Sequence, residues 1–363
     1  MKTKESKTRI LLVSPMPPAV GGISISTARL RDRLLQDGYD VDTYNLQIKT
    51  ASWIHPLWQI INTLFLPAYI LFSKPYDIIH LHVSGYWRRV YVKMVHRLFK
   101  GAMIVSTVHG DLKYYLQRPL ADHVMAMGDR IICVRPGDCD LFPEHIRGKA
   151  VEIPAFIMPT SDSITKEVLP GDVESFLSDV ADGGLPLLLF NGSVVLSKPY
   201  NDLYGLEDFA RLIVALNENK VRVAALVIIN DSIFDNRKND FIGKIERILS
   251  PCSGVKICKN KHFSLLPILN RENIIYVRPT KTDGDSLSVR EALSLGASVV
   301  ASNVAQRPQA TICYDINGGP KALYDAVLQA LSLIKNERTA ENLKSNDYYD
   351  KIIGVYDSLV KKS

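Results

Sequence analysis

The segment Arg278–Leu293 carries the densest group of residues that could do chemistry. A polar, glycine-containing loop follows the apolar run Ile274–Val277, and the pattern predicts a helix that begins near Ser286–Ser288. The free N–H groups of a first helical turn can bind a phosphate, and ionised carboxylates accept hydrogen bonds from sugar and ribose hydroxyls. Asp283 in the loop and Glu291 in the helix therefore indicate a site for a phosphorylated ligand rich in hydroxyl groups.

Two other segments present residues at the expected ends of strands. Gly21 and Gly22 follow the apolar run Arg9–Ser14, where glycines let backbone N–H groups approach an anionic ligand, although a tight turn would need them equally. His109 ends the run Ala102–His109, so its side chain either faces a ligand or forms a hydrogen bond in the core. Neither segment has the glycine spacing of a dinucleotide-binding or P-loop motif, which disfavours a dehydrogenase or a P-loop enzyme.

A zinc site is a less favoured alternative at the same strand ends. His80 and His82 share one face of an expected strand and, together with His109, could supply three imidazole ligands. No carboxylate or cysteine stands at a helpful spacing from them. We therefore expect no metal at these histidines.

Short apolar runs alternate with helical patterns along the chain, which is typical of a doubly wound α/β fold. The expected strands of a first sheet are Arg9–Ser14, Asp40–Asn45, Asp77–His82, Ala102–His109 and Arg130–Val134. After a weakly patterned stretch from Met158 to Pro186, which we interpret as a linker, a second sheet is expected. Its strands are Leu187–Asn191, Val223–Asn230, Gly254–Cys258, Ile274–Val277 and Ser298–Ala301.

Charge and cysteine content limit the classes of function. The net charge of +6 is small for a nucleic-acid-binding protein, but residues 1–150 hold 20 Lys/Arg against 12 Asp/Glu, while the rest hold 24 against 26. This asymmetry predicts that the first half faces something anionic. The five cysteines show no disulfide or zinc spacing, and the sequence begins without the apolar region of a signal peptide, so we expect a protein of the reducing cytoplasm.

Two segments of the first half raise the question of membrane contact. Residues 50–73 contain no charge, but Pro56 and Pro67 interrupt them, so we predict a buried or interfacial helix rather than a membrane span or a hairpin that dips into the membrane. The segment Trp87–Lys100 places basic residues at helical spacing, which suits either a solvated helix face or an anionic membrane surface.

The order of these motifs resembles that of a known family. Asp283 and Glu291, with seven residues between them, resemble the E-x7-E signature of retaining glycosyltransferases of the GT-B fold, specifically glycosyltransferase family four. The PP..GGI loop, the DIIHLH and TVHG strand ends, and VVAS followed by Arg307-Pro308 come in the order of that family. The resemblance covers nearly the whole chain.

The resemblance implies a role for each candidate residue. Gly21 and Gly22 would lie near the donor phosphates and the acceptor, and His109 would contact the donor sugar. Asp283 would bind sugar hydroxyls, and Glu291 would bind the ribose. The remaining residues expected to bind substrate are Ser193, Arg278, Gly284, Asp285, Ser286 and Leu287.

Two positions depart from the family pattern. The family usually places an arginine and a lysine five residues apart on the donor diphosphate; here Lys198 keeps its position, and Ser193 stands where the arginine would be. An aspartate, Asp283, replaces the first glutamate. Losing a guanidinium removes a bidentate phosphate contact, so Lys198 and the start of the helix would stabilise the leaving group, with Arg278 and Arg290 as candidates to compensate.

Asp283 and Asp285 also resemble the metal-binding D-x-D motif of glycosyltransferases with the GT-A fold. That motif would predict Mg²⁺ or Mn²⁺ at the diphosphate. Because the aspartates lie late in the chain, at an expected strand-to-helix turn of a second α/β domain, we favour a site without metal and expect no cofactor.

The resemblance implies an α/β protein of the GT-B fold, with two Rossmann-like doubly wound parallel sheets facing a central cleft. Residues 1–165 would bind the acceptor, residues 185–340 the nucleotide-sugar, and a terminal helix in 341–363 would return to the first domain.

The implied reaction is retaining transfer of a hexose from a UDP- or GDP-sugar to a glycan or polyprenyl-diphosphate-linked acceptor in surface polysaccharide synthesis. The protein would act in the cytoplasm or peripherally on the inner face of the cell membrane, and it would bind no nucleic acid. The alternatives are a non-catalytic homologue that binds nucleotide-sugar or glycan, and a GT-B-type sugar-nucleotide epimerase.

Overall fold

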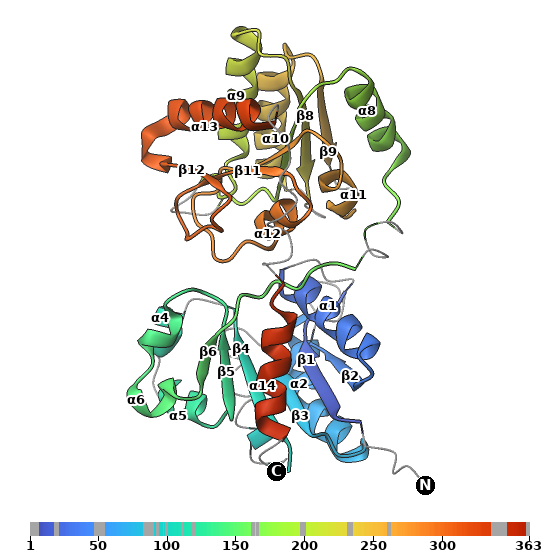
Figure 1. Cartoon of the computed structure of the whole chain (residues 1–363), viewed down its shortest axis with the longest axis vertical. Coiled ribbons are helices and arrows are strands. Elements are labelled where there is room, and N and C mark those ends of the chain that lie inside the picture. Colours follow the sequence, from blue (N-terminus) through green and yellow to red (C-terminus); the bar gives the residue numbers. More distant parts are fainter. Residues whose placement is uncertain are drawn as a thin grey trace. The chain divides into compact units, whose positions relative to one another are not determined.

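The computed structural model divides the chain into two compact units, which are described separately (Figure 1). The first unit comprises Met1–Met158 and Asp347–Ser363, and the second comprises Pro159–Asn346. The structure describes residues 7–17, 22–46, 55–82, 91, 94–96, 98, 101–109, 112–117, 121–160, 164, 167–196, 201–230, 235–259, 263–334 and 347–360.

The first unit contains a sheet of six parallel strands in the order β2-β1-β3-β4-β5-β6. The four central strands are almost fully buried because most of their residues are apolar on both faces, as a parallel sheet covered by helices on both faces requires. The strands are β1 Arg9–Ser14, β2 Asp40–Asn45, β3 Ile78–Leu81, β4 Met103–Val108, β5 Arg130–Cys133 and β6 Ala150–Glu152.

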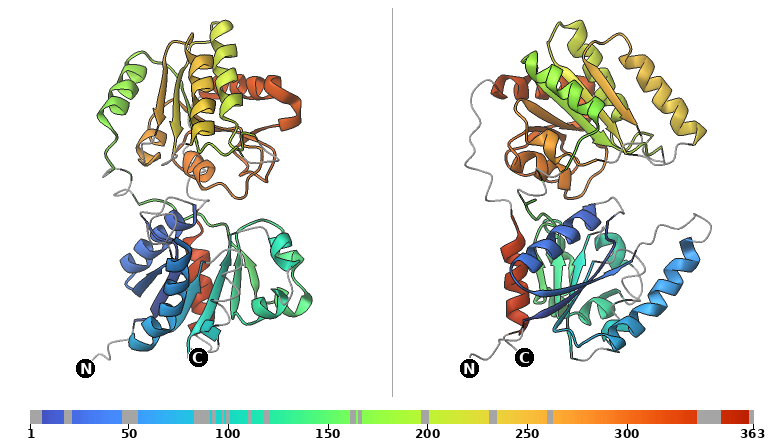
Figure 2. Two further views of the ribbon diagram at one scale, coloured as in Figure 1. Left: turned by 180° about the vertical axis from the view of Figure 1, so that it is seen from behind. Right: turned by 90° about the vertical axis from the view of Figure 1, so that its right-hand side faces the viewer.

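Helices from distant parts of the chain cover this sheet. They are α1 Gly22–Gln36, α2 His55–Phe72, α4 Leu112–Leu116, α5 Ala121–Ala126, the 3-10 helix η1 Asp138–Leu141, α6 Glu144–Arg147 and α14 Tyr349–Val360. One face of the sheet packs against α1 and α14, which lie side by side in Figure 2, and the opposite face packs against α2.

Helix α14 is an integral part of the first unit. Its residues Tyr349, Ile352 and Tyr356 are buried in the same core as Ile10 and Leu12 of β1. Polar contacts fix the start of the helix, because Tyr349 Oη donates to Asp37 Oδ2 at 2.6 Å and Arg33 pairs with Asp347 at 2.9 Å. The chain thus returns to its first sheet after completing the second unit.

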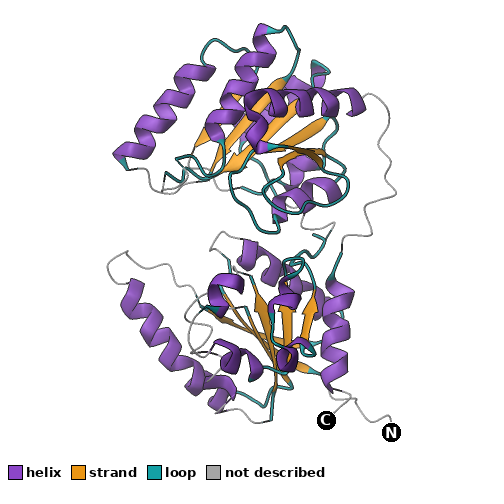
Figure 3. Cartoon of the chain, turned by 90° about the vertical axis from the view of Figure 1, so that its left-hand side faces the viewer, coloured by secondary structure: helices purple, strands orange, loops and turns teal. Residues whose placement is uncertain are grey.

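The second unit is built around another six-stranded parallel sheet, in the order β12-β11-β10-β7-β8-β9. The strands are β7 Leu187–Gly192, β8 Ala224–Ile229, β9 Val255–Lys259, β10 Ile274–Arg278, β11 Ser298–Ser302 and β12 Ile312–Tyr314. One face packs against α9 Leu206–Glu218, α10 Asn236–Leu249 and α13 Gly319–Ile334. The other face packs against α8 Gly171–Asp182, α11 Leu266–Leu269 and α12 Leu287–Ser294, and the 3-10 helix η2 Ile316–Gly318 precedes α13. Figure 3 shows helices lying against the strands within each unit.

The structure confirms two doubly wound parallel sheets and corrects three details. Each sheet has a short sixth strand, β6 or β12, that the sequence did not indicate, because three residues at a sheet edge leave almost no pattern. The stretch Met158–Pro186 is not a plain linker, since α8 lies within it and buries Val173, Leu177 and Val180 against the second sheet. The sequence pattern predicts a helix over Leu203–Asn217, whereas α9 begins only at Leu206.

Residues 50–73 contain the expected helix, α2, and Pro67 lies inside it without ending it. Leu66 and Ile70 of α2 are buried against the sheet. Within the part of the chain that the structure describes, no helix is both long and apolar enough to cross a membrane.

A tight contact joins the loop before α9 to the loop after β10. Gly205 has a φ of +72°, and a Cβ atom at this position would lie 2.1 Å from the carbonyl oxygen of Pro279. The carbonyl of Leu203 accepts hydrogen bonds from Lys281 N at 2.8 Å and from Thr280 Oγ1 at 2.9 Å. The loop that contains Asp283 is therefore held by backbone packing from another part of the unit.

We predict that Gly205→Ala lowers the free energy of unfolding by about 2 kcal/mol or more, because alanine is strained at positive φ and its methyl group collides with Pro279. Gly243→Ala is the matched control, since Gly243 lies inside α10 with open space around it and should be neutral or slightly stabilising. Urea unfolding followed by circular dichroism measures both. Equal stability of the two variants would contradict the described contact.

Candidate functional site

The predicted site residues of the second unit lie at the carboxyl end of its sheet, where ligands of such sheets bind. Arg278 is the last residue of β10, and the next residues form the loop that leads into α12. Ser193 directly follows β7, the neighbour of β10, and therefore lies at the same sheet edge. Lys198 lies outside the described residues.

The α12 helix begins at Leu287, within the Ser286–Ser288 stretch that the sequence predicted, and Ser286 is at the N-cap position. The Ser286 side chain does not cap the helix; its hydroxyl is 3.1 Å from that of Ser288, which also accepts a hydrogen bond from Tyr276. The first-turn N–H groups of α12 thus have no side-chain cap from Ser286 in the described structure, which leaves this helix start suited to an anionic ligand.

Asp283 is held by two arginines. Its Oδ2 accepts from Arg278 Nε at 3.2 Å and from Arg307 Nη1 at 2.8 Å, and its Oδ1 accepts from Arg278 Nη2 at 3.4 Å and from the backbone N–H of Gly284 at 3.1 Å. Burial raises the pKa of this carboxyl, but the two guanidinium groups outweigh burial, and the net pKa is lowered. Asp283 is therefore ionised, and its four main acceptor positions are occupied.

Arg307 is a residue that sequence reasoning did not include in the site. Its side chain is only 2% exposed, and its Nε donates to the carbonyl of Ser302 at 3.1 Å. Its sole sequence signal was its place after the VVAS segment, which is part of β11. The sheet brings Arg307 to Asp283 because β10 and β11 are neighbouring parallel strands.

A second buried ion pair stands next to the first. Arg290 Nε donates to Asp285 Oδ1 at 2.6 Å, and both side chains are largely buried. Burial raises the pKa of Asp285, and Arg290 only partly offsets this effect. Together with Asp283, Arg278 and Arg307, these residues form what we call the arginine cluster: three arginines and two aspartates, with a formal charge of +1 that favours an anion.

The two aspartates of the D-x-D motif are thus engaged with arginines rather than facing each other as a metal site. Among the described residues, no group of three His, Cys, Asp or Glu side chains is placed to hold a metal ion. Glu291 is buried on α12, one helical turn after Leu287, so these two residues lie on the same face of the helix.

In the first unit, the candidate residues also follow strand ends. Gly22 is the exposed first residue of α1, whereas Gly21 lies outside the described residues. His109 follows β4, and its Nε2 is 3.1 Å from Nδ1 of His82, which follows the neighbouring β3. The structure therefore brings these two histidines together.

His80 belongs to the same buried group but uses both ring nitrogens for other contacts. Its Nδ1 is 2.6 Å from Tyr356 Oη of α14, and its Nε2 is 2.7 Å from Thr107 Oγ1 of β4. The rings of His80 and His82 lie 4.0 Å apart, centre to centre. His80 is consequently unsuited to bind zinc, and it links α14 to the centre of the sheet.

Burial keeps His80 and His82 neutral. It lowers the pKa of His82 to about 3 and lowers that of His80 well below the usual value. Nε2 of His82 has no hydrogen-bond partner among the described residues and borders a cavity of about 20 Å³ that His109 and Thr107 also line. A neutral His82 can fix the ring of His109 by a hydrogen bond without adding charge.

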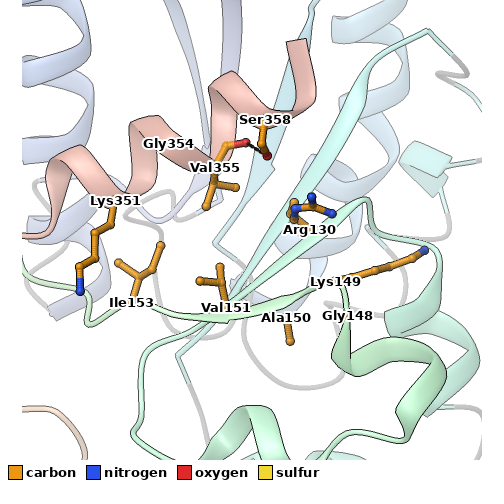
Figure 4. A pocket seen from close by; sticks show the side chains of 10 residues that line it. All are labelled: Arg130, Gly148, Lys149, Ala150, Val151, Ile153, Lys351, Gly354, Val355 and Ser358. Carbon is orange, nitrogen blue, oxygen red and sulfur yellow. Dashed lines mark hydrogen bonds between the residues drawn. The ribbon is translucent and has the colours of Figure 1, made fainter. Parts of the chain in front are cut away.

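A larger groove of the first unit, with a volume of about 360 Å³, lies between β6 and α14 (Figure 4). Val151, Ile153 and Val355 line its middle, while Lys149 and Lys351 point away at opposite sides. None of the residues that line it was predicted from the sequence to belong to a site.

Comparison with known proteins yields matches only among solved structures; no family model and no curated protein matches the chain. A glycosyltransferase from Rickettsia africae ESF-5 is 16% identical, with 99% of this chain and 100% of that chain covered and a TM-score of 0.68. The catalytic domain of starch synthase IV from Arabidopsis thaliana, bound to ADP and acarbose, is 13% identical, with 98% and 99% covered and a TM-score of 0.68. A UDP-forming α,α-trehalose-phosphate synthase from Burkholderia vietnamiensis is 14% identical, with 98% and 99% covered and a TM-score of 0.68.

This chain has the GT-B fold. The predicted fold class is confirmed by two six-stranded parallel sheets with flanking helices and by the near-complete coverage of these structures. At 13 to 16% identity the similarity establishes the fold, and the assignment to glycosyltransferase family four stays a prediction.

The buried histidines predict a specific pH dependence. The pKa of His82 is about 3 in the folded state and about 6.5 in the unfolded state. At pH values between these two, His82 therefore binds more protons when the protein is unfolded. The free energy of unfolding therefore falls as the pH drops below about 6.5, by up to about 1.4 kcal/mol per pH unit for this residue. We expect His82→Asn to reduce this slope in urea unfolding measured at a series of pH values.

The exposed His145, substituted by asparagine, serves as the control for loss of a surface imidazole. A slope in His82→Asn that equals the slope of the unsubstituted protein would show that His82 is not held neutral in the folded state.

The arginine cluster predicts a large stability effect. Asp283→Ala leaves Arg278 and Arg307 buried without their carboxylate, so the free energy of unfolding of the second unit should fall by about 3–5 kcal/mol. Asp325→Ala is the control, because it removes an exposed pair with Lys321, and fully exposed ion pairs contribute little to stability. Denaturant unfolding of both variants gives the comparison, and a loss for Asp283→Ala no greater than the control would contradict the structural role of Asp283.

Proposed function

We propose that the chain is a retaining glycosyltransferase of family four that transfers a hexose from a nucleotide-diphosphate sugar. The observation that carries this proposal is the net positive arginine cluster at the start of α12, at the carboxyl end of a parallel sheet in a GT-B protein. Two proteins of similar structure support it, since one holds ADP and the other is UDP-forming.

In this proposal, the donor diphosphate binds at the start of α12. The first-turn N–H groups and the positive charge of the arginine cluster would stabilise the charge that develops on the leaving diphosphate. Lys198 would contribute a further positive charge, and Glu291 would accept hydrogen bonds from the ribose.

The reaction forms a bond between the acceptor oxygen and the anomeric carbon and breaks the bond from that carbon to the diphosphate. The electron pair of the broken bond goes to the diphosphate oxygen, which takes the proton of the acceptor hydroxyl. No side chain is needed as the nucleophile, so the task of the protein is to orient the reactants and stabilise charge.

We assign Asp283 a positioning role, which differs from the role that the family resemblance implied. Because its acceptor positions are filled by Arg278, Arg307 and Gly284, it would hold the two guanidinium groups rather than the sugar. The contacts to sugar hydroxyls would then fall to the backbone amides of Gly284, Asp285 and Ser286. The resemblance assigns the other sugar contact to His109, whose ring the hydrogen bond between His109 and His82 would fix.

We further propose that transfer needs no divalent metal, because each aspartate of the D-x-D motif is neutralised by an arginine. The proposed acceptor is a glycan or a polyprenyl-diphosphate-linked glycan of surface polysaccharide synthesis, reached at the inner face of the cell membrane. The excess of basic residues in 1–150 supports an anionic acceptor or an anionic surface.

The second candidate is a non-catalytic homologue that binds nucleotide-sugar or glycan. Two observations favour it: Arg278 and Arg307 already occupy acceptor positions of Asp283, and a serine, Ser193, stands where the family usually has an arginine. Neither residue then supplies the group that would bind the donor. Calorimetry with a panel of UDP- and GDP-sugars, followed by a donor-turnover assay, separates the candidates. Binding without turnover favours the non-catalytic protein, and conversion of the donor in the absence of an acceptor favours the epimerase.

We predict that Glu291→Ala abolishes transfer while the protein stays folded, because the ribose loses its carboxylate partner. Donor affinity measured by calorimetry should fall at least about tenfold. Glu246→Ala, at an exposed position of α10, is the control and should retain affinity and turnover. Full activity of Glu291→Ala would refute the proposed donor site.

A further inference from the structure

The outward face of α2 is apolar, although outward faces of helices usually carry charge. Its large exposed side chains are Phe72, Leu64, Leu71 and Phe65, with exposed fractions of 92%, 71%, 67% and 63%. They fall on one stripe because their positions repeat at helical spacing, and Ala68 lies between them on the same stripe. We call Leu64, Phe65, Leu71 and Phe72 the α2 patch.

The opposite face of α2 attaches it firmly to the first unit. Leu66 and Ile70 are buried in the core cluster that covers one face of the sheet, and the hydroxyl of Tyr44 on β2 donates to Asn62 Oδ1 at 2.8 Å. Figure 2 shows α2 as an outer helix of the first unit. The α2 patch is therefore presented by a fixed helix, not by a loose segment.

The sequence on either side of α2 is basic, which fits an anionic partner. The helix itself contains no charged residue, and the exposed Lys74 follows it. Between Leu46 and Lys100, the sequence holds seven lysines and arginines and a single acidic residue, Asp77. Tyr91 and Val95 share the core cluster of Leu66 and Ile70, so these two residues pack on the same face of the sheet as α2.

We propose that the α2 patch is the surface by which this protein binds an anionic lipid bilayer. Leucine and phenylalanine side chains enter the boundary between headgroups and acyl chains, and nearby basic residues attract anionic headgroups. Tyr69, exposed at the margin of the patch, suits the headgroup level. This inference deepens the proposed membrane contact by naming its surface and does not depend on the proposed transfer reaction.

A bilayer fits this surface better than a second protein does. The patch offers leucine and phenylalanine but none of the arginine or tryptophan side chains that dominate protein interfaces. It carries no polar group that could set the orientation of a partner, which a fluid bilayer does not require.

The test is vesicle flotation of the full chain and of a variant with Leu64, Phe65, Leu71 and Phe72 replaced by serine. Vesicles are made of phosphatidylcholine alone or of an equimolar mixture with phosphatidylglycerol. Because these side chains are exposed, the substitutions remove apolar surface without opening the core. We expect the unsubstituted protein to float with the mixed vesicles and the variant to partition at least about tenfold more weakly.

The matched control replaces four exposed apolar residues elsewhere, Leu35, Val168, Leu328 and Leu333, by serine, and it should float like the unsubstituted protein. Equal flotation of the two quadruple variants, or no flotation of the unsubstituted protein, overturns the proposal. Light scattering in the absence of lipid supplies a further test, since a dimer that the α2 substitutions dissociate would make the patch a protein interface and refute lipid binding.

Donor turnover is measured separately, without vesicles and with a soluble glycan acceptor. The α2 variant should keep the turnover of the unsubstituted protein, because the patch contains none of the proposed donor-binding residues. Flotation without any turnover would support the lipid-binding surface and contradict the proposed transfer reaction. Turnover without flotation would support the transfer reaction and contradict the lipid-binding surface.

Discussion

A parallel sheet whose strands are apolar on both sides must be covered on both faces, and this requirement determines how the chain is arranged. In the first sheet, alternate residues of β1 point to opposite faces, so that Ile10 and Leu12 join one core and Leu11 and Val13 join the other. The second core is covered by α2, and the first is covered by α1 together with α14. Because the first strands need α14, the chain has to return after building an entire second unit.

The two units treat their buried polar groups in opposite ways. In the first unit, burial lowers the pKa of His80 and His82, so these side chains lose their charge and act only through hydrogen bonds. In the second unit, guanidinium groups cannot lose their proton, and Arg278 and Arg307 stay buried only because Asp283 accompanies them. The first arrangement fixes geometry without charge, whereas the second supplies a fixed positive charge at the end of a sheet.

The strands and the start of α12 could be predicted from the sequence because their signals are local: short apolar runs, a polar loop and a serine at the N-cap. The partners of Asp283 could not, since Arg307 lies 24 residues away and meets it only through the pairing of β10 and β11. The contact of His80 with Tyr356 spans 276 residues and depends on where α14 packs. The sequence also could not show which side of α2 faces the core, because a helix without charged residues has no polar face from which its orientation could be inferred.

The return of α14 also reverses the usual order in which a protein completes its parts during synthesis. Domains generally fold from the N-terminus as they emerge from the ribosome, but the core of the first unit needs Tyr349, Ile352 and Tyr356. These residues follow the roughly 190 residues of the second unit, which take roughly 10–40 s to translate at about 5–20 residues per second. Throughout that interval one face of the first sheet stays partly uncovered, so the second unit can finish folding first, and the nascent first unit presents an apolar surface of the kind that chaperones bind.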